Sequence, residues 1–338
     1  MKKILVTGNL GYIGSVLCNF LEDKNFFVKG LDIGLFKNCN ISPCNDPSNQ
    51  IFKDIRDISE NDLKEVDIIV HLASLSNDPL GQLNAGLTSD INYKATVKLA
   101  ELAKKSGIER FIFISSQSIY GISNTDDELD EDKSIKNPIT EYAISKWKAE
   151  CDLIKLKDKD FCITFLRPST VFGASPRLRS DIVFNNFVAC AFTEGKIEIK
   201  SDGKPWRPVL HVKDLCEAIY ASIVSPTNNI NGEAFNVGIL NGNYTVKTLA
   251  IEAQKSFPTS ELVFLNETKS SDERTYKVSF KKIYEVLGNF YKPKWNLNKG
   301  AKELIDFFET IKFSSKDFRG KKTIRLLALK EKLKEVIR

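Results

Sequence analysis

The chain has 338 residues, 42% apolar and 28% charged, which is suited to about two globular domains and excludes a disordered chain. The net charge is 49 − 44 = +5, spread along the chain, which does not indicate a nucleic-acid-binding face. No apolar run approaches the roughly 20 residues of a membrane helix, and the first apolar stretch is too short for a signal peptide. We therefore expect a cytoplasmic protein with neither a membrane nor a nucleic-acid partner.

Short apolar runs alternate with helical stretches through the first half of the chain. The runs at 68–73 and 111–115 are apolar almost throughout, as expected for strands buried on both faces of a sheet. Strand–helix alternation predicts an α/β fold with a doubly wound parallel sheet and right-handed crossovers. The expected strands are 3–7, 27–32, 51–53, 68–73, 111–115 and 161–166, and the expected helices are 13–23, 92–106 and 140–156.

After about Arg167 the pattern becomes less regular, and clusters of Gly, Pro and Asn appear. We predict a first domain over 1–167, to which some later elements can return, and a smaller second region over 168–313. Residues 314–338 form a basic helical tail with Ile324, Leu327, Leu333 and Ile337 on an amphipathic pattern. We expect this tail to pack on the main body.

Cysteine and histidine are too sparse for a disulfide framework or a metal centre. The chain has seven cysteines, of which Cys39 and Cys44 are the only close pair. His71 and His211 are the only histidines, and no second Cys pair or His cluster completes a zinc site. We expect reduced, mostly buried thiols and no metal.

A glycine-rich loop follows the first strand and opens the first helix. Gly8, Gly11 and Gly14 are spaced three apart. Glycine permits a tight turn and close approach of the backbone to a pyrophosphate, and a helix N-terminus offers N–H donors to phosphates. An ordinary glycine turn is the alternative, but the strand–turn–helix context favours dinucleotide binding.

Asp32 ends the second strand, where a carboxylate accepts hydrogen bonds from the ribose hydroxyls of NAD. It would repel the extra phosphate of NADP, and no Arg follows it closely, so NAD is favoured. The alternative is a turn-forming Asp between Gly30 and Gly34. Asp54 and Ile55, after the third strand, are candidates to cap the adenine.

Two groups of polar residues are candidates for catalysis. Tyr142 and Lys146 are four residues apart and share one face of a predicted helix. An adjacent ammonium lowers the pKa of a tyrosine, whereas a surface helical pair is the plain alternative. Hydroxyls at 115–118 emerge at the carboxyl end of a parallel strand, where doubly wound folds bind ligands, and one of them could share a proton with Tyr142.

Together these features resemble the extended short-chain dehydrogenase/reductase family, in its nucleotide-sugar epimerase/dehydratase branch. The resemblance covers about residues 1–290. It also includes Asn92 and the segments 54–55, 71–73, 167–168, 206–214 and 236–238. It implies a Rossmann NAD-binding domain over 1–167 and a nucleotide-sugar-binding region over 168–313.

By the same resemblance, Tyr142 is the acid/base and Lys146 its activator and ribose clamp. Ser116, five residues before Gly121, is the helper hydroxyl, and Arg207 pairs with the substrate diphosphate. The cofactor-binding residues implied are Gly8, Gly11, Tyr12, Ile13, Gly14, Asp32, Asp54, Ile55, Leu72, Ala73, Ser74, Asn92, Tyr142, Lys146 and Ser169. The substrate-binding residues implied are Ser118, Thr170, Asn185, Asn186, Arg207 and Arg274. His71 and His211 are interpreted as structural.

The chain departs from the family pattern at specific positions. Dehydratases of the family carry an Asp-Glu pair after the helper hydroxyl, but Gln117 and Ser118 stand here. Family epimerases often have Asn at the position of Thr170. Asp78 could be an added proton carrier, although an Asp before Pro in a turn is the plainer interpretation.

The leading hypothesis is an NAD-dependent epimerase of a nucleotide-diphosphate sugar that works through a transient keto-sugar. One alternative is an NAD(P)H-dependent keto-sugar reductase, which would exchange its cofactor at every turnover. Another is a non-catalytic dinucleotide sensor, which would need neither Tyr142 nor Lys146. Helices 92–106 and 140–156 resemble those that pair in family dimers, so we expect a homodimer.

Overall fold

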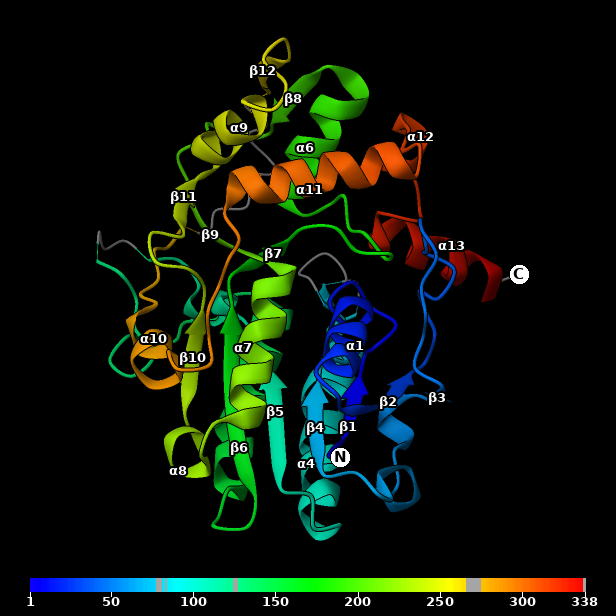
Figure 1. Ribbon diagram of the computed structural model, residues 1–338, viewed down its shortest axis with the longest axis vertical. Coiled ribbons are helices and arrows are strands. Elements are labelled where there is room, and N and C mark those ends of the chain that lie inside the picture. The colour runs from blue at the N-terminus through cyan, green and yellow to red at the C-terminus, as the bar shows by residue number, and fades with distance from the viewer. Residues whose placement is uncertain (77–80, 83, 124–126, 266–274, 337–338) are drawn as a thin grey trace.

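The structure is a computed structural model that describes residues 1–76, 81–82, 84–123, 127–265 and 275–336. A seven-stranded sheet with all neighbours parallel forms its centre, in the order β10-β6-β5-β4-β1-β2-β3 (Figure 1). Its strands are β1 (Lys3–Thr7), β2 (Phe27–Asp32), β3 (Asn49–Phe52), β4 (Ile68–His71), β5 (Arg110–Ile114), β6 (Cys162–Pro168) and β10 (Ala234–Val237). This sheet confirms the predicted α/β fold.

Helices cover both faces of the sheet (Figure 1). The four main ones are α1 (Gly14–Asp23), α4 (Ala95–Lys105), α5 (Glu141–Leu153) and α7 (Val212–Val224). Successive residues of a strand point to opposite faces. Ile4 and Val6 of β1 accordingly pack in one apolar cluster with α1 and α7, and Leu5 in another with α4 and α5. Burial on both faces explains why these strands are apolar throughout.

The second half of the chain builds two small sheets and further helices beyond the carboxyl ends of the large sheet (Figure 1). Strand β9 (Trp206–His211) lies between β7 (Thr170–Phe172) and β11 (Asn243–Thr245), and β8 (Lys196–Ile199) pairs with β12 (Glu261–Phe264). The helices of this half besides α7 are α6 (Val183–Glu194), α8 (Thr227–Ile230), α9 (Val246–Gln254), α10 (Lys281–Leu287), α11 (Leu297–Thr310), α12 (Ser315–Phe318) and α13 (Arg325–Val336). Of these, α8 lies at the amino ends of the strands, where Arg110 bonds Thr227 (Figure 1). The short helix α3 (Ala85–Ser89) belongs to the first half. Strand β10 comes from the second half but pairs with β6 in the large sheet.

The strand order reverses at β1, which has β2 on one side and β4 on the other. In doubly wound sheets ligands bind outside the carboxyl ends of the strands at such a reversal. Gly8 follows β1 at this point and lies directly against the chain that leaves β4.

Several predicted elements differ from the observed ones at their ends, and three of these differences lie close to the site. The strand expected over 68–73 stops at His71, where the chain turns beside Gly8. A π-helical turn, Asp90–Lys94, precedes α4 within the helix expected over 92–106. The helix expected over 140–156 ends as α5 at Leu153 and continues as a 3₁₀ turn, Ile154–Leu156.

The tail packs on the main body, as expected, but through other residues. Thr323 is 0% exposed and Arg325 2%, whereas Leu327 is 41% exposed. The prediction that Leu327 lies on the packed face of the tail is therefore wrong. The face that packs against the protein carries Thr323 and Arg325 and makes polar contacts there. Ile337 and the side chain of Leu333 lie outside the described residues. No helix in the described part of the chain combines the length and apolar character that crossing a membrane requires.

Replacing Gly8 by Ala tests how closely the Gly8 backbone approaches Ala73 at the strand reversal, through the loss of folding free energy. Gly8 has φ +72°, and a Cβ would lie 2.7 Å from Ala73 N; Gly107 has φ +73° with no atom within 4 Å of its Cβ position. We expect Gly107→Ala to cost about 1–2 kcal/mol for the left-handed conformation, and Gly8→Ala about 1–3 kcal/mol more for the backbone clash. Urea denaturation measures both. Equal costs would contradict the close approach.

Candidate active site

The turn between β1 and α1 leaves no room for a side chain at Gly8 or Gly14. A Cβ on Gly14, the first residue of α1, would lie 2.5 Å from Asn9 Cα, and Gly11 N donates to Gly8 O at 3.0 Å. With Gly8 against Ala73, the turn forms a bare backbone surface at the carboxyl ends of β1 and β4. Such a surface is what close contact with a pyrophosphate requires.

The N-terminus of α1 lies at the same turn and has backbone N–H groups that make no hydrogen bond in the described structure. Within the described chain, the backbone N–H groups of Tyr12, Ile13 and Gly14 donate no hydrogen bond. The helix dipole adds positive charge at this end. Bare backbone, N–H donors and dipole together fit the phosphates of a dinucleotide.

Asp32 stands at the end of β2, beside this turn. Its carboxylate accepts hydrogen bonds from Gly34 N at 2.7 Å and from Leu10 N at 3.2 Å. Burial raises its pKa, and these N–H groups and the charge of Arg177 oppose that shift. Arg177 is distant in the sequence, and its guanidinium donates to Asp46 Oδ1 at 2.9 Å. The carboxylate is thus fixed where the resemblance places a ribose partner.

His71 is structural, as expected. It is fully buried and bonds through Nδ1 to Thr7 Oγ1 at 2.7 Å and through Nε2 to Thr96 Oγ1 at 2.8 Å. Burial lowers its pKa to about 3, so the imidazole is neutral. It joins β1, β4 and the start of α4 beneath the site.

Asn92 holds the loop that follows β4. Its Oδ1 accepts from Leu75 N at 2.8 Å, and its Nδ2 donates to Leu75 O at 3.2 Å. Leu72 and Ala73 precede this loop, and the buried Ser74 Oγ has no hydrogen-bond partner in the described structure. A buried hydroxyl without a partner is costly, so this Ser74 is suited to meet a ligand. The assignment of these residues to the cofactor stays a prediction.

Tyr142 and Lys146 lie on consecutive turns of α5, beside the end of β5. Lys146 is 2% exposed, and its Nζ donates to Ile114 O at 2.8 Å. The Nζ lies 4.7 Å from the ring centroid of Phe113 and 5.9 Å from that of Tyr142. Burial lowers the pKa of Lys146 to about 7, and the charge of Glu150 opposes this shift. Lys146 thus joins the end of β5 to the side of α5 that carries Tyr142.

The serine-rich end of β5 is held by internal hydrogen bonds. Ser116 Oγ accepts from Ser118 N at 3.1 Å, and the two hydroxyls bond each other. Gln117 is 1% exposed, and its Nε2 donates to Arg167 O at 3.1 Å. The 3₁₀ turn Gln117–Tyr120 contains no acidic residue. This strand end therefore offers hydroxyls and an amide but no carboxylate.

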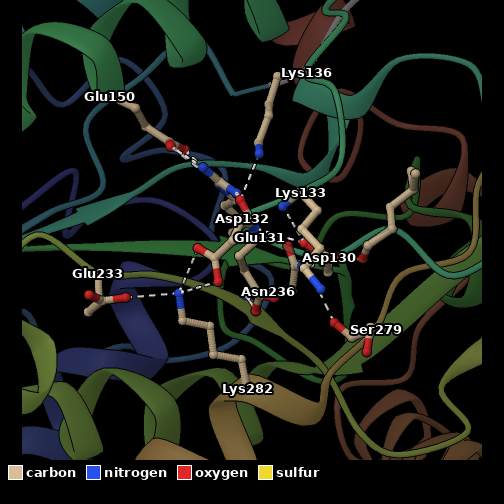
Figure 2. Close-up of polar contacts among 12 residues, drawn as sticks. Asp130, Glu131, Asp132, Lys133, Lys136, Glu150, Glu233, Asn236, Ser279 and Lys282 are labelled. Carbon is tan, nitrogen blue, oxygen red and sulfur yellow. Dashed lines mark hydrogen bonds and ion pairs between the residues drawn. The ribbon is translucent and has the colours of Figure 1, made fainter.

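A buried ion pair anchors α5 to the end of β6. Arg167 NH2 lies 2.6 Å from Glu150 Oε2, and both side chains are 4% exposed. Arg167 NH1 also donates to Tyr120 OH at 3.1 Å and to Glu131 O at 3.3 Å. Asn236 N, on β10, donates to Glu131 Oε1 at 2.7 Å (Figure 2). Removing one member of such a pair leaves an uncompensated buried charge, which is strongly destabilising.

Two lysines hold the loop that carries Glu131 (Figure 2). Lys136 Nζ donates to Glu131 O at 2.7 Å, and Lys282 Nζ lies 3.0 Å from Asp132 and 2.8 Å from Glu233. The network ties this loop to α5, β6 and β10. It thereby fixes the helix one turn beyond Lys146.

Arg179 is a candidate site residue that the sequence analysis missed. Its guanidinium binds Asp181 at 3.0 and 2.9 Å and reaches Ser76 Oγ at 3.4 Å, with 11% of the side chain exposed. Burial lowers its pKa, but the pairing with Asp181 outweighs it and the net pKa is raised. The phenols of Tyr12 and Tyr142 act in the same direction as Asp181. An Arg and an Asp two residues apart carry no distinctive sequence signal.

The two candidate substrate asparagines have different surroundings. Asn185 is fully buried; its Oδ1 accepts from Gly173 N at 2.9 Å and its Nδ2 donates to Tyr12 OH at 3.3 Å. Tyr12 OH itself donates to Gly173 O at 2.8 Å. Asn186 is partly exposed, and its Nδ2 donates to Ser180 O at 2.9 Å. Of the two, Asn186 keeps exposed surface for a ligand.

The other predicted residues lie around the strand ends. Ser169 Oγ donates to Val237 O at 3.0 Å, and Thr170 begins β7. Arg207 lies on β9, and Arg274 lies outside the described residues. Their roles toward substrate and cofactor stay predictions.

Asp54 caps a 3₁₀ turn in which Ile55 is buried. Its carboxylate accepts from Arg56 N at 2.9 Å and from the Arg56 guanidinium at 2.7 Å. The hydrogen bonds from Arg56 lower its pKa. Whether this residue also meets the adenine stays a prediction.

Comparisons with known proteins agree with this geometry. A sequence profile of the NAD dependent epimerase/dehydratase family matches residues 4–238. The dTDP-D-glucose 4,6-dehydratase of Mus musculus is 28% identical over 330 residues, 91% of this chain and 88% of that protein. A putative UDP-glucose 4-epimerase of Methanocaldococcus jannaschii is 28% identical over 316 residues, 90% of this chain and 98% of that protein.

Solved structures share the fold. The UDP-glucuronic acid 4-epimerase of Bacillus cereus, in complex with UDP-glucuronic acid and NAD, superposes with a TM-score of 0.76 at 23% identity, over 91% of this chain and 99% of that one. The UDP-glucose 4-epimerase of Thermotoga maritima, with UDP-glucose, gives 0.79 at 24% identity over the same shares.

The buried Lys146 predicts how stability depends on pH. Its pKa falls from 10.5 to about 7 on folding, so between these values the unfolded chain binds more protons than the folded one. The free energy of unfolding should therefore gain up to about 1.4 kcal/mol per pH unit from this group as pH rises through the window. Denaturation of Lys146→Met at several pH values should show that contribution missing. Identical slopes for the variant and the wild type would contradict the lowered pKa of the buried Lys146.

Proposed function

The chain belongs to the NAD dependent epimerase/dehydratase family, and within it we propose that this enzyme epimerises a nucleotide-diphosphate sugar through a transient keto-sugar. NAD is the cofactor of the family, and the bare glycine turn, the donors of α1 and Asp32 fit it. The relatives named above act on UDP- and dTDP-sugars, which supports a substrate of that class.

The observation that carries the choice of epimerisation is the chemistry at the end of β5. Eliminating water from a sugar requires an acid for the leaving hydroxyl and a base for the adjacent carbon. Gln117 and Ser118 provide a neutral amide and a hydroxyl after Ser116, and the turn has no carboxylate. Oxidation and reduction at one carbon need only a group that moves the hydroxyl proton, and Tyr142 is suited to that role.

When bound, NAD supplies a reversible hydride acceptor. Tyr142, as the phenolate favoured by Lys146, takes the proton of a ring hydroxyl while its carbon is oxidised to the ketone. Ser116 shares a hydrogen bond with that hydroxyl. After the ketone has presented its other face, Tyr142 returns the proton as the carbon is reduced. Arg207, with its fixed guanidinium fork, binds the substrate diphosphate.

The proposal includes a homodimer in the cytoplasm. Support for the dimer comes from α4 and α5, which lie together on one face of the sheet, with Tyr93 bonded to Asp152 across them. Leu87 is 36% exposed and Ile91 is partly buried just before α4, which leaves apolar surface for a second copy. Helices from the partner would extend this packing.

Tyr142→Phe tests the proposed acid/base. Removing the hydroxyl should lower kcat on a convertible UDP- or dTDP-hexose by about 10²–10⁴, the usual contribution of proton transfer by a positioned side chain. The melting temperature and NAD binding should stay close to those of the wild type, since the ring remains. Epimer interconversion followed by chromatography gives kcat.

Tyr93→Phe is the matched control, because it removes a tyrosine hydroxyl that bonds Asp152 and lies outside the proposed chemistry. It should keep kcat within about twofold of the wild type, as expected of a surface substitution. Near-normal turnover in Tyr142→Phe would refute the assignment of the acid/base.

A further inference from the structure

The tail, of which the structure describes residues 314–336, runs from the region around α6 and β8 to the loop between β2 and β3. Figure 1 shows α12 near the end of α11 and α13 beside the chain that joins β2 to β3. That loop, residues 33–48, contains no helix or strand and follows Asp32 directly. Its position therefore depends on contacts from other segments.

The first anchor of the tail is ionic. Arg319 binds Glu194 of α6 at 2.9 Å and Glu198 of β8 at 3.1 Å. Cys190 Sγ and these carboxylates have ligand atoms within 4.8 Å of one another, an arrangement that could suit a metal ion. The Arg319 guanidinium already donates hydrogen bonds to Glu194 and Glu198, so these two carboxylates bind the tail.

The second anchor fixes the loop before α6. Ser180 N donates to Thr323 O at 3.1 Å, and Ser180 Oγ donates to Phe318 O at 2.8 Å. Thr323 and Phe318 are buried. Ser180 lies between Arg179 and Asp181, so this anchor holds the segment that carries their ion pair.

The third anchor reaches the loop between β2 and β3. Arg325 is 2% exposed; its NH2 donates to Arg177 O at 2.7 Å, and its Cζ lies 5.4 Å from the ring centroid of Phe36. Lys332 Nζ donates to Leu35 O. Arg177 in turn binds Asp46 at the far end of the loop. The loop is thus held at both ends by contacts that include the tail.

Burying the guanidinium of Arg325 at this position costs free energy of folding. Within the described chain it has no carboxylate partner, and its hydrogen bonds go to the carbonyls of Arg177 and Lys322. A buried guanidinium without a counter-charge costs more free energy than an apolar side chain of similar size. If Arg325 served stability alone, a large apolar residue would serve better.

We propose that the tail acts through Arg325 as a positioning element, holding the loop between β2 and β3 so that Asp32 and Gly34 keep the adenosine half of NAD bound through turnover. The inference rests on the proposed function, because an enzyme that returns hydride to its substrate must retain its cofactor. Arg325 is a positioning residue: it acts on the loop and does not touch the reacting groups. Gly34 N bonds the Asp32 carboxylate at 2.7 Å, so displacement of the loop would move the ribose partner.

Arg325→Met tests the proposal, because it keeps volume and removes the donors. The Kd for NAD, measured by calorimetry on the folded protein stripped of cofactor, should rise several-fold to about tenfold. The upper value, about tenfold, is the change expected when the loss of the charged hydrogen bond from Arg325 to Arg177 O is transmitted in full to the site. At saturating NAD, kcat should stay within about twofold, because Tyr142 and Lys146 are untouched. An unchanged Kd would overturn the proposal, including when the melting temperature falls.

Two further variants distinguish an effect of the whole tail on the Kd for NAD from a local effect of residue 325. Arg319→Met removes the anchor on α6 and β8, and within the described chain Arg319 contacts no residue of the loop. A rise in the Kd for NAD in this variant supports transmission through the tail, and a wild-type Kd contradicts it. Lys330→Met removes an exposed cation from α13 and should leave the Kd unchanged.

Lys332→Met provides the test if Arg325→Met does not fold, since Lys332 is partly exposed and loses only the contact to Leu35 O. A several-fold rise in the Kd is expected, and an unchanged value overturns the proposal. NAD binding is measured apart from turnover. Failure of epimerisation with these Kd shifts intact would therefore contradict the proposed function and leave the role of the tail supported.

Discussion

The site depends on the approach of two backbones where the order of the strands reverses. Gly8 follows β1 in a left-handed conformation, and its Cα lies so close to Ala73 that a Cβ would clash at 2.7 Å. This contact brings the end of β4 to the start of α1 and leaves bare backbone and N–H donors at one point. Because the sheet is parallel, the ends of β2 and β5 lie at the same edge. Asp32 is bonded to the turn through Leu10 N, and Ser116 lies at this edge beyond the end of β4.

Charge burial is the second constraint on the molecule. Lys146 is held between Ile114 O and the ring of Phe113, where burial lowers its pKa toward neutrality. One turn further, Glu150 pairs with Arg167 and ties α5 to β6. The pair costs desolvation but fixes the helix, so that the face of α5 that carries Tyr142 and Lys146 keeps its orientation toward the strand ends.

Features that depend on neighbouring residues in the sequence could be predicted. Contacts between segments that are far apart in the chain could not. Strand 3–7 and the glycine turn follow from apolar runs and spacing, and they appear as expected. The pairing of Arg179 with Ser76, and the charge of Arg177 near Asp32, join segments far apart in the chain and have no periodic signal. The tail is the clearest example of a feature that the sequence does not predict. The spacing of apolar residues predicts that Leu327 is buried, yet the fold buries Arg325, because backbone carbonyls there accept its hydrogen bonds.

The central claim is that hydride leaves one carbon of the substrate and returns to the same carbon without exchange. Turnover of a convertible nucleotide-diphosphate hexose in deuterium oxide, followed by NMR of the product, tests it directly. The account predicts interconversion of epimers without added cofactor and without deuterium on any ring carbon, because Tyr142 moves only the exchangeable hydroxyl proton. Deuterium at a ring carbon, loss of water from the sugar or net consumption of NADH would contradict it.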